Sequence, residues 1–288
     1  LSLHDALPIY NCGVFVNAPM NAPAYIKEHG IEVIKSPIYL WHSSIYNRGN
    51  IPEYEYITVR ANSFSLEDLK QMFTYGWAAQ AFHSLGLLEY VAKFYNQLYG
   101  LKYVKFYELF LGYCQRGEVT LFSQEFDTLK DYIDTGYSGG GWDHHDESLA
   151  PIFWPIEEAT WLRCVKDSVL LRDEILLFLS YLENEMDFDT EKEVVEDLVG
   201  FQVFVLSTMD HKGDMKTYES GFGWKEFLVN EVSSLVDLDR NRREYSWENK
   251  VTLKDTAEWC YRAIWVGRNQ GNYKCHPEHL IENIIACS

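Results

Sequence analysis

The sequence predicts an α+β fold that is mostly helical, in which a short α/β segment precedes a larger helical region. β-Branched and aromatic runs, which are typical of strands, are concentrated in residues 10–63. After Ser63, apolar residues recur at spacings of three and four, which is the pattern of helices with one buried face. Residues 10–63 hold too few strands to close a sheet, so we expect them to need neighbouring strands.

Within the α/β segment, short apolar or alternating runs predict strands, and one stretch predicts a helix. Residues 22–29 suit a short helix that Asn21 caps and that ends before Gly30. Pro37 separates two of the predicted strands, because proline interrupts a hydrogen-bonded ladder. The strands are expected at residues 12–20, 31–36, 38–44 and 54–63, the last with two different faces.

The helical region begins with a recognisable start signal. Ser65 and Asp68 resemble a capping box, and an apolar stripe then runs from Leu66 to Leu88. The dense acidic run in residues 181–199 is interpreted as the solvated face of a helix. Further helices are expected at residues 103–115, 118–134, 156–180, 190–206 and 253–268, a flexible glycine-rich loop at 136–148, and a short hairpin within 216–250.

The first nine residues, LSLHDALPI, fit no structural pattern. They lack the basic region of a signal peptide and have no amphipathic period. The codons CTT TCC CTA CAC GAC GCT CTT CCG ATC encode them, and this string resembles a common short-read sequencing adapter. We therefore expect residues 1–9 to be an artefact. The natural sequence is then expected to start near Tyr10, at a point in the middle of the natural polypeptide. The expected domains are residues 10–63 and residues 64–288.

Composition narrows the classes of partner. The 288 residues carry 25 basic and 43 acidic side chains, a net charge of −18, which argues against nucleic acid and anionic membranes as partners. No apolar run approaches the length of a membrane span. Six scattered cysteines form no C-x-x-C pair and no iron–sulfur spacing, so we expect reduced thiols and a cytoplasmic location.

Two segments combine metal-ligand side chains, each with a more ordinary alternative. Asp143, His144 and His145 lie in WDHHDES. This segment can be interpreted either as a zinc or iron site or as a solvated loop. Cys275, His276 and His279, with Cys287, suit zinc by type, but their spacing fits no finger pattern. The solvated loop and a chain tail are the preferred interpretations, so no metal site is predicted.

Two histidines lie in positions of interest. His83 falls near the apolar stripe of a helix and is interpreted as a packed core histidine. His42 closes a predicted strand, where barrel enzymes place working residues. No phosphate loop, nucleophile elbow or H-E-x-x-H motif occurs. The residues alone therefore assign no catalytic residue and no cofactor-binding motif.

Four segments together resemble the C-terminal portion of large bacterial radical SAM proteins that carry an N-terminal B12-binding domain. They are VNAPMNAPAYIKEHGIEVIKSPIYLWHSS, IPEYEYITVRANSFSLEDLKQM, WAAQAFHSLGLLEYVAKFYN and AIWVGRNQGNY. The resemblance implies that residues 10–63 are the last strands of a partial TIM-type barrel and that residues 64–288 form a helical C-terminal region. The parent is then implied to use a [4Fe–4S] cluster, S-adenosylmethionine and possibly cobalamin, none of which a motif in this chain binds.

On this interpretation the chain forms the barrel end and a substrate-facing cap of a radical SAM enzyme with methyltransferase-like or related chemistry. Its partners are the missing N-terminal part of the same polypeptide and an unknown substrate. Candidate residues for the substrate cavity follow or end predicted strands, and they are Asn17, Met20, Asn21 and His42. Two alternatives stay open: a free-standing helical binding or interaction module without catalysis, and a metal-dependent hydrolase that uses the DHHDE loop.

Overall fold

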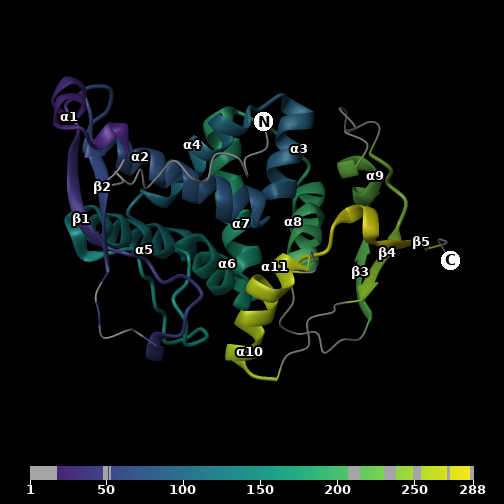
Figure 1. The fold of residues 1–288 in the computed structure, drawn as a ribbon. Coiled ribbons are helices and arrows are strands. Elements are labelled where there is room, and N and C mark those ends of the chain that lie inside the picture. The colour runs from purple at the N-terminus through teal and green to yellow at the C-terminus, as the bar shows by residue number, and fades with distance from the viewer. Residues whose placement is uncertain are drawn as a thin grey trace.

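A computed structural model describes residues 18–47, 51, 53–206, 215–229, 238–248, 254–270 and 273–285. Most of these residues are helical, and two small antiparallel sheets lie at opposite ends of the helical body (Figure 1). The α-helices are α1 Pro23–His29, α2 Leu66–Trp77, α3 Glu89–Tyr99, α4 Tyr103–Cys114, α5 Leu121–Thr135, α6 Ile156–Lys166, α7 Ser168–Met186, α8 Lys192–Leu206, α9 Trp224–Val229, α10 Thr256–Cys260 and α11 Gly267–Asn269. The strands are β1 Glu32–Pro37, β2 Tyr54–Arg60, β3 Met215–Ser220, β4 Arg243–Glu248 and β5 Ile281–Ile284.

Shorter helical turns join these elements. Within the described residues, the π-helical turns are η4 Ala78–Ser84, η5 Gly136–Gly140 and η7 Tyr261–Val266, and the 3₁₀ turns are η2 Pro19–Asn21, η3 Ile45–Asn47 and η8 Pro277–His279. The turn η4 continues α2, and η7 joins α10 to α11. The expected helix at 253–268 therefore exists, but a π-helical turn forms its middle.

The N-terminal sheet consists of β1 and β2, which pair antiparallel. Strands of a TIM-type barrel are parallel, so the expected barrel end at residues 10–63 is not confirmed. The predicted strand at 38–44 is wrong, because this segment turns and makes only one isolated bridge, from Ser44 to Ile152. The predicted strand at 12–20 begins outside the described residues, and its end forms the turn η2.

Glycine determines two local features of this end of the molecule. Gly30 ends α1 with a φ of 60°, as expected, whereas Ala22 and not Asn21 occupies the N-cap. The predicted flexible loop at 136–148 is wrong in its first half, which forms η5 against β1. A Cβ atom on Gly139, whose φ is 88°, would lie 2.9 Å from the backbone oxygen of Lys35. Glycine therefore permits a close approach of two backbones here rather than mobility.

Side-chain caps set the starts of several helices. The capping box between Ser65 and Asp68 is confirmed at the start of α2. The helix expected at 156–180 is instead two helices, because Asp167 leaves the helical conformation. Its carboxylate accepts hydrogen bonds from the backbone N–H groups of Val169 and Leu170 and so begins α7.

One continuous apolar core joins the helices from α2 to η7 and extends to the C-terminal sheet. Its largest fully buried side chains include Trp77, Trp142, Trp154, Trp161, Trp224 and Trp259. A buried amide is satisfied inside it: Gln202 accepts from the backbone N–H of Tyr90 at 2.7 Å and donates to the carbonyl of Gly86 at 2.6 Å. This pair of bonds holds α8 against the start of α3.

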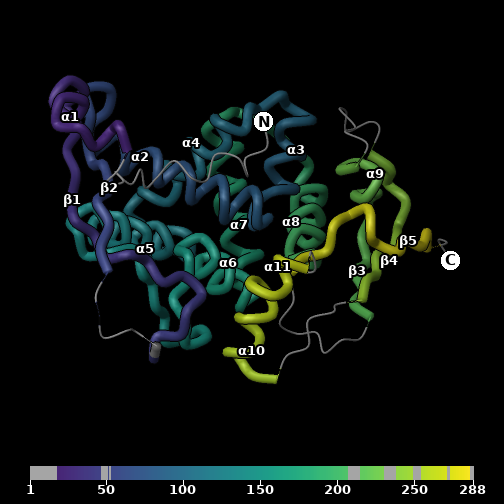
Figure 2. The backbone as a smooth tube through the Cα atoms, viewed as in Figure 1, coloured from purple at the N-terminus to yellow at the C-terminus, as the bar shows by residue number. Residues whose placement is uncertain are grey.

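The C-terminal sheet has the order β3-β4-β5, with antiparallel pairs throughout. The short hairpin expected within 216–250 is therefore wrong in its connection: β3 and β4 do pair, but α9 lies between them in the chain. From α11 the chain crosses to β5 beside β4 (Figure 2). Within the described ranges, no helix is long and apolar enough to cross a membrane.

Candidate functional site

The segment around His42 is held against a second loop that precedes α6. The backbone N–H of His42 donates to the carbonyl of Phe153 at 2.6 Å, and Phe153 returns a hydrogen bond to Ser43 at 3.0 Å. The indole N–H of Trp41 donates to the carbonyl of Trp142 at 2.9 Å. These bonds fix the path of residues 40–45 without a strand.

His42 has an unusual backbone conformation. Its φ is 62°, in the left-handed region that residues other than glycine rarely adopt. Together with Asp187, it has this property among the described non-glycine residues. Such conformations are kept where surrounding contacts over-determine them, and they concentrate at functional sites. Here the conformation turns the imidazole toward α6.

Glu158 connects His42 to Arg268 in α11. One carboxylate oxygen of Glu158 lies 2.6 Å from Nε2 of His42, and the other accepts a hydrogen bond from Nη1 of Arg268 at 2.5 Å. The Glu158 side chain is 3% exposed, compared with 18% for His42 and 31% for Arg268. Glu158 lies in the first turn of α6, where the helix dipole favours a negative charge. The His42 cluster, defined as His42, Glu158, Arg268, Glu157 and Trp265, thus joins three distant segments.

Aromatic rings enclose the imidazole. Trp265 stacks on His42 with ring centroids 4.0 Å apart and an interplanar angle of 25°. The ring of Trp154 meets the imidazole of His42 edge-on, with ring centroids 6.0 Å apart. The rings exclude water from one side of the imidazole, and the carboxylate fixes its orientation. Among the described residues, Nδ1 of His42 has no hydrogen-bond partner, so this atom can serve as a donor or acceptor for a ligand.

Glu157 adds a second carboxyl group to the cluster. Burial, and then the charge of the neighbouring Glu158, raise the pKa of Glu157 to about 7, although Arg268 and His42 act in the opposite direction. Its side chain is partly exposed. A carboxyl group with this pKa exchanges a proton near neutral pH, which suits it to acid–base work.

We expect Glu157→Gln to stabilise the chain above neutral pH. A carboxyl whose pKa is raised on folding contributes stability below its unfolded value of about 4.5, and this contribution is lost as the pH rises through about 7. The substitution should therefore raise the free energy of unfolding at pH 8 by about 1–3 kcal/mol, discounted for partial exposure. Urea unfolding at pH 4.5, 6, 7 and 8 measures the difference.

The matched control is Glu193→Gln, because Glu193 is the second residue of α8, as Glu157 is of α6, but is exposed. The control should show no gain of stability at pH 8. An equal response of the two variants, or a gain for Glu157→Gln that does not depend on pH, would contradict the raised pKa.

Two of the other predicted cavity residues, Met20 and Asn21, lie within the described part of the chain. Both residues belong to the turn η2, which precedes α1, whereas His42 follows β1 in the chain. The Met20 side chain is exposed. Asn17 lies outside the described residues. Of the four candidates, His42 is therefore the residue that the structure places in a cluster.

The WDHHDES segment is not a solvated loop throughout, because several of its side chains are partly or fully buried. Asp143 accepts a hydrogen bond from the backbone of Leu40 at 2.6 Å, and His144 lies 3.1 Å from Arg163. Burial, followed by the charge of Arg163, lowers the pKa of His144 to about 4. His145 is exposed. Within the part of the chain that the structure describes, no three His, Cys, Asp or Glu residues are grouped to hold a metal ion.

The remaining histidine and cysteine segments have structural roles. The expected chain tail at KCHPEH is wrong, because Lys274 and Cys275 are buried and the backbone N–H of Cys275 donates to Val205. His276 and His279 contact each other edge-to-face, and Cys287 lies outside the described residues. His83 bonds to the hydroxyl of Tyr107 at 3.1 Å, which confirms it as a packed histidine.

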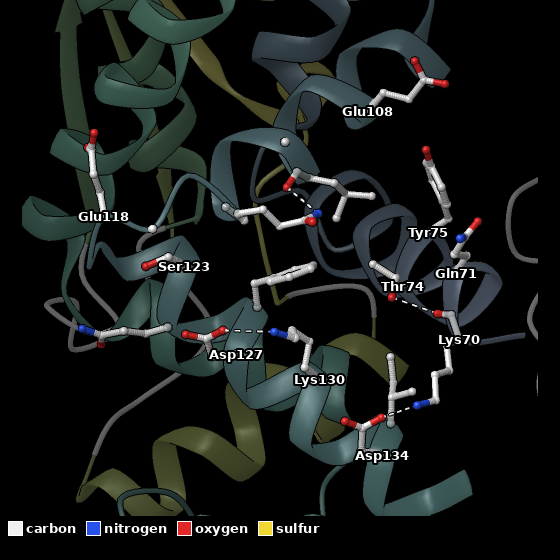
Figure 3. A pocket seen from close by; sticks show the side chains of 18 of the residues that line it. Lys70, Gln71, Thr74, Tyr75, Glu108, Glu118, Ser123, Asp127, Lys130 and Asp134 are labelled. Atoms are coloured by element: carbon white, nitrogen blue, oxygen red, sulfur yellow. Dashed lines mark hydrogen bonds and ion pairs between the residues drawn. The ribbon is translucent and has the colours of Figure 1, made fainter. Parts of the chain in front are cut away.

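A groove of about 850 Å³ lies elsewhere, between α2, α4 and α5 (Figure 3). Its two lysines point toward carboxylates rather than into open space, since Lys70 bonds to Asp134 at 2.5 Å and Lys130 lies 4.0 Å from Asp127. The groove contains Cys114, but burial raises the pKa of this thiol and makes it a poor nucleophile. None of the described residues that line the groove is a histidine. The groove therefore offers fewer side chains suited to catalysis than the His42 cluster does.

Sequence reasoning missed the partners of His42. Two signals were present: Glu157 and Glu158 are adjacent carboxylates just after Pro155, at the start of a predicted helix, and both Trp265 and Arg268 lie in AIWVGRNQGNY. Two of the segments that carry the family resemblance thus meet at one cluster, although they are more than 200 residues apart.

The chain is similar to one curated protein of known activity. It is 24% identical over 244 residues to TokK, a cobalamin-dependent radical SAM methyltransferase of Streptomyces tokunonensis. The match covers 78% of this chain and 34% of TokK, so the chain spans about a third of the length of this relative. No protein-family model matches the chain. The similarity relates the chain distantly to radical SAM proteins that use cobalamin.

Proposed function

We propose that the chain is the C-terminal part of a radical SAM enzyme that depends on cobalamin, and that it forms a cap whose His42 cluster faces the substrate. The similarity to TokK carries the enzyme class. The role of the cluster is supported by its geometry: an oriented imidazole, a buried carboxylate and an arginine meet at a partly exposed position. The partners of the chain are then the preceding part of the same polypeptide and the substrate, rather than nucleic acid or a membrane.

We assign a different role to each residue of the cluster. Glu158 uses both oxygens to hold His42 and Arg268, so it positions rather than reacts. His42 offers Nδ1 to a polar atom of the substrate, and Glu157 holds or releases a proton beside it. Trp265 limits rotation of the imidazole by stacking. Together they can orient a polar group of the substrate.

The described residues do not fit an iron–sulfur cluster. Cys114, Cys164, Cys260 and Cys275 are free and buried, and burial raises the pKa of each thiol. A cluster needs several thiolates brought together, and no such group occurs in the described ranges. We propose that the cluster, S-adenosylmethionine and cobalamin bind to the preceding part of the parent enzyme.

The test is to recover the natural gene upstream of the codon for about Tyr10 and to express the longer polypeptide without oxygen. We expect a C-x-x-x-C-x-x-C motif on the order of 150–200 residues upstream, given the length of a barrel. The purified protein should hold about four iron atoms and one cobalamin, and the present chain, treated identically, should hold neither. A start codon near residue 10, or an upstream frame without the cysteine triplet, contradicts the proposal.

The alternative is a free-standing helical binding module, and one observation favours it. The core that joins α2 to η7 is continuous and contains its own satisfied polar groups. Recovery of a complete gene that begins near residue 10, with cooperative unfolding of its product, would make this alternative the better account.

A further inference from the structure

His42 occupies a tight turn of the backbone. The carbonyl of Leu40 accepts hydrogen bonds from the backbone N–H of Ser43 at 2.9 Å and from its hydroxyl at 2.5 Å. Residues 40–43 thus form a β-turn with His42 in third position, and its φ of 62° matches the positive φ that a type II turn requires there. Glycine or asparagine is usual at this position, because larger side chains rarely adopt the left-handed region. A histidine therefore needs support from its surroundings to stay in this turn.

The WDHHDES segment supplies this support, although it lies more than 100 residues further along the chain. A carboxylate oxygen of Asp143 accepts a hydrogen bond from the backbone N–H of Leu40, the first residue of the turn, at 2.6 Å. The carbonyl of Trp142 accepts a hydrogen bond from the indole N–H of Trp41, the second residue, at 2.9 Å. Two consecutive residues of the segment thus hold the two turn residues that precede His42.

Trp142 gives Asp143 a rigid base. Its side chain is fully buried, and its ring stacks on Phe73 of α2 with ring centroids 5.2 Å apart. Its carbonyl also accepts a hydrogen bond from the hydroxyl of Tyr132 in α5 at 2.7 Å. Because α2 and α5 fix Trp142, the carboxylate of the next residue is presented to Leu40 from the packed core rather than from a free loop.

The two ends of the turn are held in different ways. At the exit, the backbone groups of His42 and Ser43 bond to the backbone of Phe153, so these bonds depend on no side chain. At the entry, the N–H of Leu40 bonds to the side chain of Asp143. A hydrogen bond to a carboxylate is stronger than one between neutral groups, and a half-buried N–H that loses its acceptor destabilises the conformation that needs it.

We propose that Asp143 is a positioning residue for His42. Its carboxylate holds the first N–H of the turn, and the turn then directs the imidazole onto Glu158 and Trp265. The inference rests on the proposed function, because Asp143 acts on the site through the His42 cluster. It adds to that function a residue of the WDHHDES segment whose work is to orient the site.

NMR of the chain with labelled histidine reads the position of the His42 ring, whose signals are assigned by their loss in His42→Gln. The ring stacks on Trp265 with centroids 4.0 Å apart, and the ring current of an indole shields protons above its face. The ring protons of His42 should therefore resonate upfield of those of the exposed His145. Asp143→Ala should remove at least about half of this upfield shift, because the imidazole then leaves Trp265. Asp143→Asn should retain it, because its amide oxygen still accepts from Leu40.

The matched control is Asp146→Ala, because Asp146 lies in the same segment but bonds to Arg163 instead of the turn. It should leave the His42 signals in place even where it lowers stability. The signals of His83, which bonds to Tyr107, show in each variant whether the core is folded. A purely structural role of Asp143 would lower stability without moving the His42 signals.

A second variant removes the same hydrogen bond without changing any side chain. An ester in place of the amide between Tyr39 and Leu40 deletes the donor N–H, and it should shift the His42 signals as Asp143→Ala does. This variant decides the question if Asp143→Ala does not fold.

Unchanged His42 signals in folded Asp143→Ala or in the ester variant overturn the proposal. An equal shift in Asp146→Ala, or a shift in Asp143→Asn as large as in Asp143→Ala, overturns it as well. The measurement needs neither substrate nor cofactor, so its failure is separate from that of the proposed function. Recovery of the upstream cysteine motif together with unmoved His42 signals contradicts the role of Asp143 alone, and a gene without that motif contradicts the enzyme class alone.

Discussion

Replacing Glu125 with alanine is expected to lower the free energy of unfolding by about 3–5 kcal/mol. Glu125 is buried in α5, and its two carboxylate oxygens accept hydrogen bonds from Nε and Nη2 of Arg163 at 2.7 and 2.6 Å. Removing the carboxylate leaves a guanidinium, itself largely buried, with Asp146 at 3.0 Å as its remaining charged partner. Urea unfolding followed by tryptophan fluorescence measures the loss.

The matched control is Glu118→Ala, which removes the exposed partner of Arg116 and should cost less than about 1 kcal/mol. The double variant Glu125→Ala with Arg163→Met should lose less stability than the sum of the single losses, because no buried charge is then left unpaired. A loss for Glu125→Ala no greater than that for Glu118→Ala would show that the buried pair does not stabilise the fold.

Glu158→Ala should have the next largest effect, a loss of about 2–4 kcal/mol, somewhat below that of a fully buried pair because both partners are partly exposed. The substitution removes the interactions of Glu158 with both His42 and Arg268. These interactions link the loop at residues 40–45, α6 and α11. Glu158→Gln keeps a hydrogen-bond acceptor and should lose less. Unfolding in urea gives the free energies, and near-ultraviolet circular dichroism reports the changed packing of Trp265.

A double-mutant cycle isolates the link between Glu158 and His42. The coupling free energy between Glu158→Ala and His42→Ala is expected to be about 1–3 kcal/mol. His83→Ala serves as the control, because His83 bonds to Tyr107, away from the cluster, and should show no coupling to Glu158→Ala. Additive effects of Glu158→Ala and His42→Ala would show that the two residues do not interact energetically. That result would contradict the structural basis of the proposed site.

Local signals in the sequence determined much of the helical region. The capping box at Ser65, the apolar stripes and the left-handed glycine after α1 were recognisable because each depends on neighbours within about four residues. The exposed tyrosines and buried Ile57 of β2 follow in the same way from alternation along one strand. His42 was selected because it ends a predicted strand; the structure has no strand there, and it places His42 beside Glu158 and Arg268.

Contacts between distant segments decided the rest. The glycines of η5 suggested a flexible loop, but the backbone of β1 lies against them, and no local pattern encodes that approach. Asp167 divides a continuous apolar stripe because its side chain finds the backbone of α7. The His42 cluster joins residues 42, 157–158 and 265–268, so its geometry depends on how the core packs these segments together. The sequence by itself determined most of the helical segments, and only the tertiary structure decided which side chains meet, because a buried carboxylate and its partners are brought together by packing across the whole chain.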